Sequence, residues 1–159
     1  MANTQAMCTS FLGELLSATH NFSSANPAQT LNTANTFKAA LYLASATLNA
    51  STTAYSATGE VTGTGYTAGG VTVTGATNPA STNASTTAGV GYWTPSASIT
   101  YTTVTLSTAF DTMLLYNSTQ SNKAVAVYTF GSQTITAGNF TLTMPTNSTT
   151  AALVRLSTT

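Results

Sequence analysis

The sequence predicts an all-β protein: an antiparallel β-sandwich or jelly-roll-like fold of about eight strands, preceded by one short helix. Three observations support this. Strand-like runs recur every 8–12 residues and are separated by Gly, Pro or Asn. Threonine, a β-branched residue that favours strands, is abundant throughout the chain. A helical spacing of apolar residues occurs only near the N-terminus.

The predicted helix covers residues 5–18, where apolar side chains form one wide stripe. Met7, Phe11 and Leu15 are four residues apart, and a neighbouring row is made by Cys8, Leu12 and Leu16. Gly13 weakens such a helix by about 1 kcal/mol relative to alanine, so its stability must come from packing. Two interpretations stay open. The stripe covers its own sandwich, or residues 1–22 form an arm that docks on a partner subunit.

The remaining chain is interpreted as strands joined by turns and loops. Residues 1–35 are expected to form the helix and arm, and residues 36–159 the β-sandwich domain. Residues 75–91, rich in Ser, Thr, Ala and Asn, are interpreted as an exposed excursion. A bulge or a change of strand is expected near Thr102 and Thr103. The strands are predicted at residues 36–43, 71–74, 99–106, 111–117, 123–130, 133–136, 139–144 and 151–156, with turns at 117–122, 131–132 and 137–138.

Charge is scarce, and this limits the classes of function. Charged residues make up 4% of the chain and sum to zero, against about 25% in ordinary domains. Three basic residues are too few for a nucleic-acid footprint, and no apolar run approaches the 20 residues of a membrane span. We therefore expect a soluble protein that binds neither nucleic acid nor membrane, and whose surface tolerates dense packing against other proteins. No signal-peptide pattern is present, so synthesis in a host cytoplasm is expected.

No pattern of catalytic or metal-binding residues is recognisable. The single histidine, His20, lies in a polar segment and is interpreted as plain surface. The three carboxylates, Glu14, Glu60 and Asp111, are not spaced like a glycosidase pair, and the single cysteine, Cys8, excludes an internal disulfide. The sequence therefore predicts no enzyme, no cofactor and no metal.

Several sequence phrases resemble a group of small virion proteins of tailed bacteriophages. They are MANTQAMCTSFLGELL at the N-terminus, then TFKAALYLASATL, TTAYSATGEV, GTGYTAGGV, LLYN and NKAVAVYTFG, and the resemblance covers roughly residues 36–156. It implies a β-sandwich protein of the capsid decoration (cement) type. Such a protein binds the exterior of the phage head as a homo-oligomer, and its partners are the major capsid protein and other copies of itself.

The candidate contact residues are apolar or aromatic. Five belong to the N-terminal segment and two to the segment that follows the excursion: Phe11, Leu12, Leu15, Leu16, Phe22, Tyr92 and Trp93. The alternative function is a tail-associated or receptor-binding module of a fibre or spike. In that alternative, Tyr66, Tyr92 and Trp93 hold sugar by stacking and hydrogen bonding.

Overall fold

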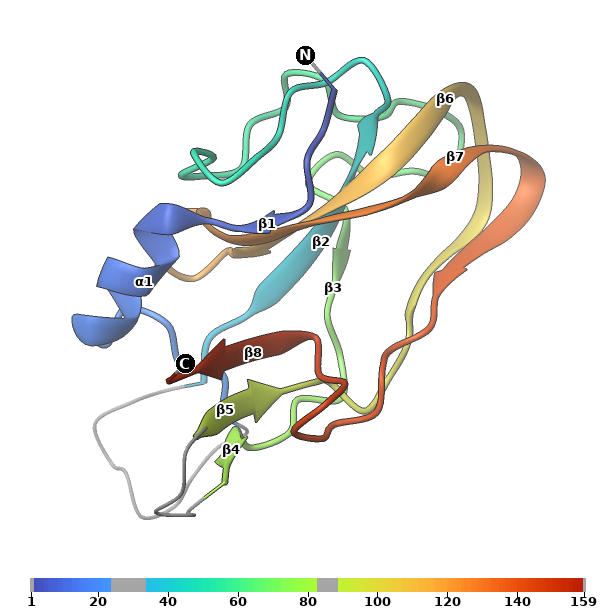
Figure 1. The fold of residues 1–159 in the computed structure, drawn as a ribbon. Helices are drawn as coiled ribbons and strands as arrows, with labels where there is room; N and C mark the ends of the chain where they lie inside the picture. The colour runs from blue at the N-terminus through green and yellow to red at the C-terminus, as the bar shows by residue number, and fades with distance from the viewer. Residues whose placement is uncertain (1, 24–33, 83–88, 159) are drawn as a thin grey trace. The chain divides into compact units, whose positions relative to one another are not determined.

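The computed structural model describes residues 2–23, 34–82 and 89–158. Within them the fold class predicted from the sequence is confirmed: eight strands in two antiparallel sheets, sandwich-like in class, with one short N-terminal helix. The elements, shown in Figure 1, are β1 (Ala6–Met7), α1 (Thr9–Leu16), β2 (Phe37–Leu43), β3 (Val71–Thr72), β4 (Ala80–Ser81), β5 (Val90–Trp93), β6 (Ile99–Asn117), β7 (Lys123–Leu142) and β8 (Val154–Ser157).

The chain divides into two compact units. The first contains residues 1–20, 35–72 and 100–141, and the second contains residues 21–34, 73–99 and 142–159. Residues 2–20 thus belong to the same unit as β2 and the long strands, and β1 pairs with β7 there. The expected boundary after residue 35 stays a prediction.

The first unit contains the five-stranded sheet, in the order β1-β7-β6-β2-β3. β2 lies between β6 and β3 and is paired on both edges, and side chains on both of its faces are buried. β6 has neighbours on both sides, and an unbroken run from Met113 to Asn117 is buried. Residues 111–117 therefore lie in a central strand of this sheet.

β6 and β7 form a long curved hairpin, 19 and 20 residues in length, whose two strands run side by side in Figure 1. This corrects the prediction of several short strands. The turns expected at 131–132 and 137–138 are absent, and the segments 99–106 and 111–117 are one strand. A glycine within a strand does not end it when the partner strand continues alongside. Near Thr102 and Thr103, where a bulge or a change of strand was expected, β6 continues without a change of strand, but its backbone is irregular: Thr103 has a φ of 51°.

The second unit contains a three-stranded sheet in the order β4-β5-β8. β5 pairs with β8 from Val90 to Trp93, and β4 adds two pairs on the other side. The predicted excursion at 75–91 therefore contains β4 and the start of β5; its residues 83–88 lie outside the described residues. The last strand begins at Val154, three residues later than predicted.

Candidate functional site

The seven candidate contact residues differ in burial and fall into three groups. Three are buried in the chain itself: Phe11, Phe22 and Trp93. Leu15 and Tyr92 are half-buried. Leu12 is 47% exposed and Leu16 is 93% exposed. Because Leu12 and Leu16 are four residues apart in α1, they are neighbours on one helix face. They form the candidate docking surface, which we call the leucine pair.

α1 is shorter than predicted, and one side of it is anchored. The helix covers Thr9–Leu16 rather than residues 5–18, because residues 6–7 pair with β7 as β1 instead. The backbone N–H of Cys8 donates to Val125 O at 3.0 Å, which joins the start of the helix to β7. Phe11 is completely buried. The segment is thus part of its own folded unit, and only the leucine pair side of the stripe is open to solvent.

A polar network holds the opposite side of α1. Lys123 Nζ donates to Glu14 Oε1 at 2.7 Å, and His20 Nε2 lies 2.7 Å from Glu14 Oε2. Asn117 Nδ2 lies 3.1 Å from His20 Nδ1 and donates to Asn35 Oδ1 at 2.8 Å. The prediction that His20 is plain surface is wrong: its side chain is completely buried, beside the ring of Phe11.

The network selects one protonation state of His20. Asn117 Oδ1 accepts the backbone N–H groups of Thr119 and Gln120, so its amide nitrogen must face the imidazole. His20 Nδ1 is then an acceptor, and Nε2–H is the donor to Glu14. The imidazole is therefore neutral, with its proton on Nε2. Burial lowers the pKa of His20, although Glu14 acts in the opposite direction. Burial alone would raise the pKa of Glu14, but the hydrogen bonds from Lys123 and His20 hold it below its usual value.

We expect acid to destabilise the protein in two steps. The native pKa of His20 lies below its ordinary value of 6.5, so below pH 6.5 the unfolded state binds a proton that the native state refuses. Stability then falls by up to about 1.4 kcal/mol per pH unit until the native pKa is reached. Glu14 adds a second loss below its ordinary value of 4.5. Urea unfolding at pH 7, 5.5 and 4 measures both steps.

A histidine variant separates the two steps. His20→Gln retains an amide that can donate to Glu14 but cannot bind a proton in this range. Between pH 6.5 and 4.5, the free energy of unfolding of this variant should depend less on pH than that of the wild type. Below pH 4.5 the variant should still lose stability. Equal slopes for the variant and the wild type would show that His20 does not titrate as proposed.

A second carboxylate, Glu60, is buried and surrounded by hydrogen-bond donors. Tyr55 Oη donates to Glu60 Oε2, and both Tyr66 Oη and the backbone N–H of Gly69 donate to Oε1, each at 2.7 Å. Tyr66 Oη also accepts the N–H of Leu41 in β2 at 3.0 Å. Burial and Glu60 raise the pKa of Tyr55 to about 12, so its hydroxyl stays protonated.

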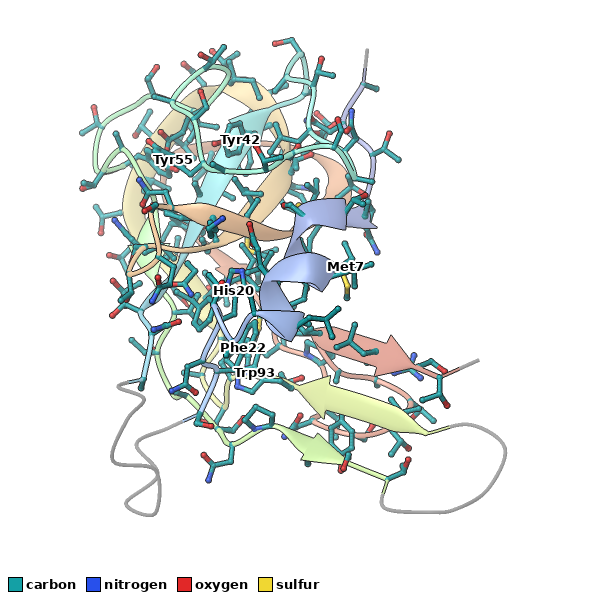
Figure 2. The ribbon with its side chains drawn as sticks, turned by 90° about the vertical axis from the view of Figure 1, so that its left-hand side faces the viewer. Met7, His20, Phe22, Tyr42, Tyr55 and Trp93 are labelled. Atoms are coloured by element: carbon teal, nitrogen blue, oxygen red, sulfur yellow. The ribbon has the colours of Figure 1, made fainter. Side chains whose placement is uncertain are left out.

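The tyrosines around Glu60 attach a long loop to the sheet. The ring of Tyr55 stacks on Tyr116 with centroids 4.9 Å apart, and Tyr116 Oη donates to Gly69 O. Tyr42 Oη donates to Ser56 O at 2.5 Å, and Figure 2 shows Tyr42 and Tyr55 in the same region of this unit. Residues 44–70 contain three isolated β-bridges but no strand. Side chains therefore hold this loop together with scattered backbone hydrogen bonds, such as the one that Val61 N–H donates to Leu41 O. The Glu60 cluster is structural.

One feature of the sequence indicates this cluster. Tyr55 and Tyr66 stand five and six residues from Glu60 in a segment almost without other large side chains. A carboxylate between two phenols can accept from both when the segment folds back on itself. Glu60 makes no ion pair among the described residues, where both ion pairs belong to Glu14.

Two aromatic residues of the second unit, Phe22 and Trp93, also make contacts within the chain. Phe22 packs on Trp93 with ring centroids 4.8 Å apart, as their neighbouring labels in Figure 2 show. Trp93 Nε1 donates to Thr77 O at 2.9 Å. Two of the three aromatics considered for sugar binding, Tyr66 and Trp93, thus have their polar atoms engaged in internal hydrogen bonds.

The remaining features that bear on chemistry are few. Among the described residues, no three His, Cys, Asp or Glu side chains gather so as to hold a metal ion. Burial and then Glu14 raise the pKa of Cys8 to about 11, so it is a thiol at neutral pH. An open pocket of about 390 Å³ is lined by Tyr42 and by small residues of the following loop, none of them charged. No helix in the described part of the chain is long and apolar enough to cross a membrane.

Comparisons with protein-family models, with curated proteins and with solved structures found no match to this chain. The resemblance to phage virion proteins is therefore a hypothesis that rests on the sequence phrases alone.

Proposed function

We propose that this chain is a non-enzymatic bacteriophage virion structural protein, a capsid decoration (cement) protein that binds the exterior of the head. Its partners are the major capsid protein and other copies of itself, and the leucine pair of α1 contacts the shell. The resemblance described above supplies the phage context. The observation that carries the docking role is an exposed apolar pair on a helix whose other side is firmly anchored.

The anchoring of α1 matters because a helix that is already ordered loses little conformational entropy when it binds a partner. Phe11 and the Glu14 network fix α1 in place before any partner arrives, so little conformational entropy is lost on association. Leu16, at 93% exposure, is the most exposed of the large apolar side chains in the described residues. Burying one leucine contributes about 1.5–3 kcal/mol, which is about tenfold to 150-fold in affinity.

The rest of the surface suits dense packing between proteins. With six charged side chains of zero net charge, a neighbouring subunit meets mostly threonine and serine hydroxyls, which cost little to desolvate compared with ions. The alternative tail-associated role has weaker support, because two of the aromatic residues proposed for sugar binding, Tyr66 and Trp93, make internal hydrogen bonds.

A binding experiment with matched leucine variants tests the proposal. Leu12→Asp/Leu16→Asp is expected to lower occupancy on shells of the major capsid protein by 100-fold or more, with thermal unfolding of the free protein unchanged. Leu156→Asp is the control, because Leu156 is also exposed, at 36%, but lies in β8.

Imaging of particles decides between the two locations. Hundreds of copies on the shell agree with a cement role, whereas a few copies on a tail or spike refute it. Full occupancy of the shell by the double variant would be compatible with the cement role. It would refute the proposal that the leucine pair makes the contact.

A further inference from the structure

Among the described residues, no strand pairs with the outer edge of β7 along most of its length. β1 lies at that edge of the sheet, but it pairs only with Ala126 and Val127. β7 continues to Leu142, far past the last residue that β1 covers, as Figure 1 shows. Residues 131–134 are exposed. A strand edge without a neighbour presents unpaired N–H and C=O groups that favour the addition of another strand.

The hydrogen bonds of β1 show which groups point outward. Val125 O accepts the N–H of Cys8, and Val127 pairs with Ala6. In a strand, the backbone N–H and C=O groups of every second residue point toward the same edge. The backbone groups of residues 129, 131, 133 and 135 therefore also face the outer edge. The far end is marked by Ala137, which has a φ of 45° and donates its N–H back to Thr105 Oγ1 of β6.

Two glutamine side chains occupy the place of a missing strand. Gln5 Oε1 accepts the outward N–H of Thr129 at 3.4 Å, and Gln133 Nε2 donates to the outward C=O of Gly131 at 3.0 Å. Both glutamines are exposed. An amide side chain offers the same groups as a peptide bond, so these contacts mark the edge as a site that a backbone could take over.

The edge also lacks the features by which proteins usually prevent pairing. Natural edge strands carry lysine, proline or inward charges. Residues 128–142 contain no charged residue and no proline. Two copies could therefore meet at this edge without electrostatic repulsion. A charged partner strand would find no opposite charge here to pair with.

We propose that residues 129–135 of β7 pair with the same residues of a second copy, antiparallel about a twofold axis. A twofold axis perpendicular to the strand makes the two strands antiparallel, and each outward N–H of one copy can then donate to an outward C=O of the other. The five-stranded sheet becomes a ten-stranded sheet across the dimer. This inference deepens the self-association within the proposed function, but it does not depend on binding to a capsid.

Sedimentation velocity of the full chain, with two proline variants, tests the pairing. The wild type is expected to be a dimer that dissociates on dilution. Gly131→Pro removes an outward N–H, and no atom lies within 4 Å of a Cβ at that position. We expect at least tenfold weaker dimerisation with unchanged circular dichroism. Ser132→Pro, whose N–H faces β6, is the control and is expected to lower the melting temperature instead.

A charge variant keeps the inference falsifiable if the proline variant does not fold. Gln133→Lys places two like charges beside the twofold axis and is expected to give monomers. Thr108→Lys adds the same charge to an exposed position of β6, which lies between β7 and β2, and should leave the dimer intact. A monomeric wild type, or a Gln133→Lys variant that dimerises like the wild type, overturns the inference. Either result leaves the shell-binding test of the leucine pair unaffected.

Discussion

Gly70→Ala is expected to destabilise the protein by about 4 kcal/mol or more, which is among the largest effects of single substitutions. A Cβ at Gly70 would overlap the carbonyl of Ala39 and come within 2.7 Å of Cα of Ala40, both backbone atoms of β2. Gly70 also has a φ of 68°, where a side chain adds strain of about 1–2 kcal/mol. β2 is paired on both edges and cannot move away.

Two other glycines serve as controls in the same urea titration. Gly69 has a φ of 86°, but a Cβ there would meet only the ends of the Tyr116 and Lys38 side chains, so Gly69→Ala should cost about 1–2 kcal/mol. Gly131→Ala meets nothing within 4 Å and should change stability by less than 1 kcal/mol. If Gly70→Ala costs no more than Gly69→Ala, the close approach of residue 70 to β2 is not as described.

Gly70 illustrates what the sequence could predict and what it could not. The glycine-rich segment before residue 71 predicts a turn that begins a strand, and β3 does begin at Val71. The sequence does not tell which of the glycines is indispensable, because that depends on Ala39, some thirty residues earlier. The turn follows from the local sequence, whereas the loss of stability caused by a substitution depends on tertiary contacts.

The same distinction explains the errors in the strands and in the candidate site. Gly131 and Gly138 resemble turn residues, but β6 continues beside them and keeps β7 extended. A helix was predicted at α1, but Met7 and Cys8 of its predicted stripe precede α1. Phe11 is buried beside His20 while Leu16 is exposed, a difference that depends on tertiary contacts and not on the spacing of the stripe. His20 could not be paired from the sequence with Asn117, a contact across 97 positions.

Glu60→Ala is expected to destabilise the protein by about 3–5 kcal/mol. Three donors lose their acceptor at once, the hydroxyls of Tyr55 and Tyr66 and the N–H of Gly69. Leaving a buried donor unsatisfied costs about 1–3 kcal/mol, and water entering the vacated space recovers part of that sum. Because Tyr66 also accepts the N–H of Leu41, the loop at residues 44–70 should loosen from β2 before the sheet unfolds.

Hydrogen exchange measured together with urea unfolding separates this effect from a general loss of stability. In Glu60→Ala, amides of residues 44–70 should exchange faster than those of β6, whereas Glu60→Gln retains one acceptor oxygen and should cost about half as much. Asp111→Ala is the matched carboxylate control, since Asp111 is only half-buried and accepts bonds from Asn3 and Thr112 elsewhere in the unit. Equal costs for Glu60→Ala and Asp111→Ala would refute the view that the Glu60 cluster holds the loop, because the two variants remove the same charge and differ in the donors left behind.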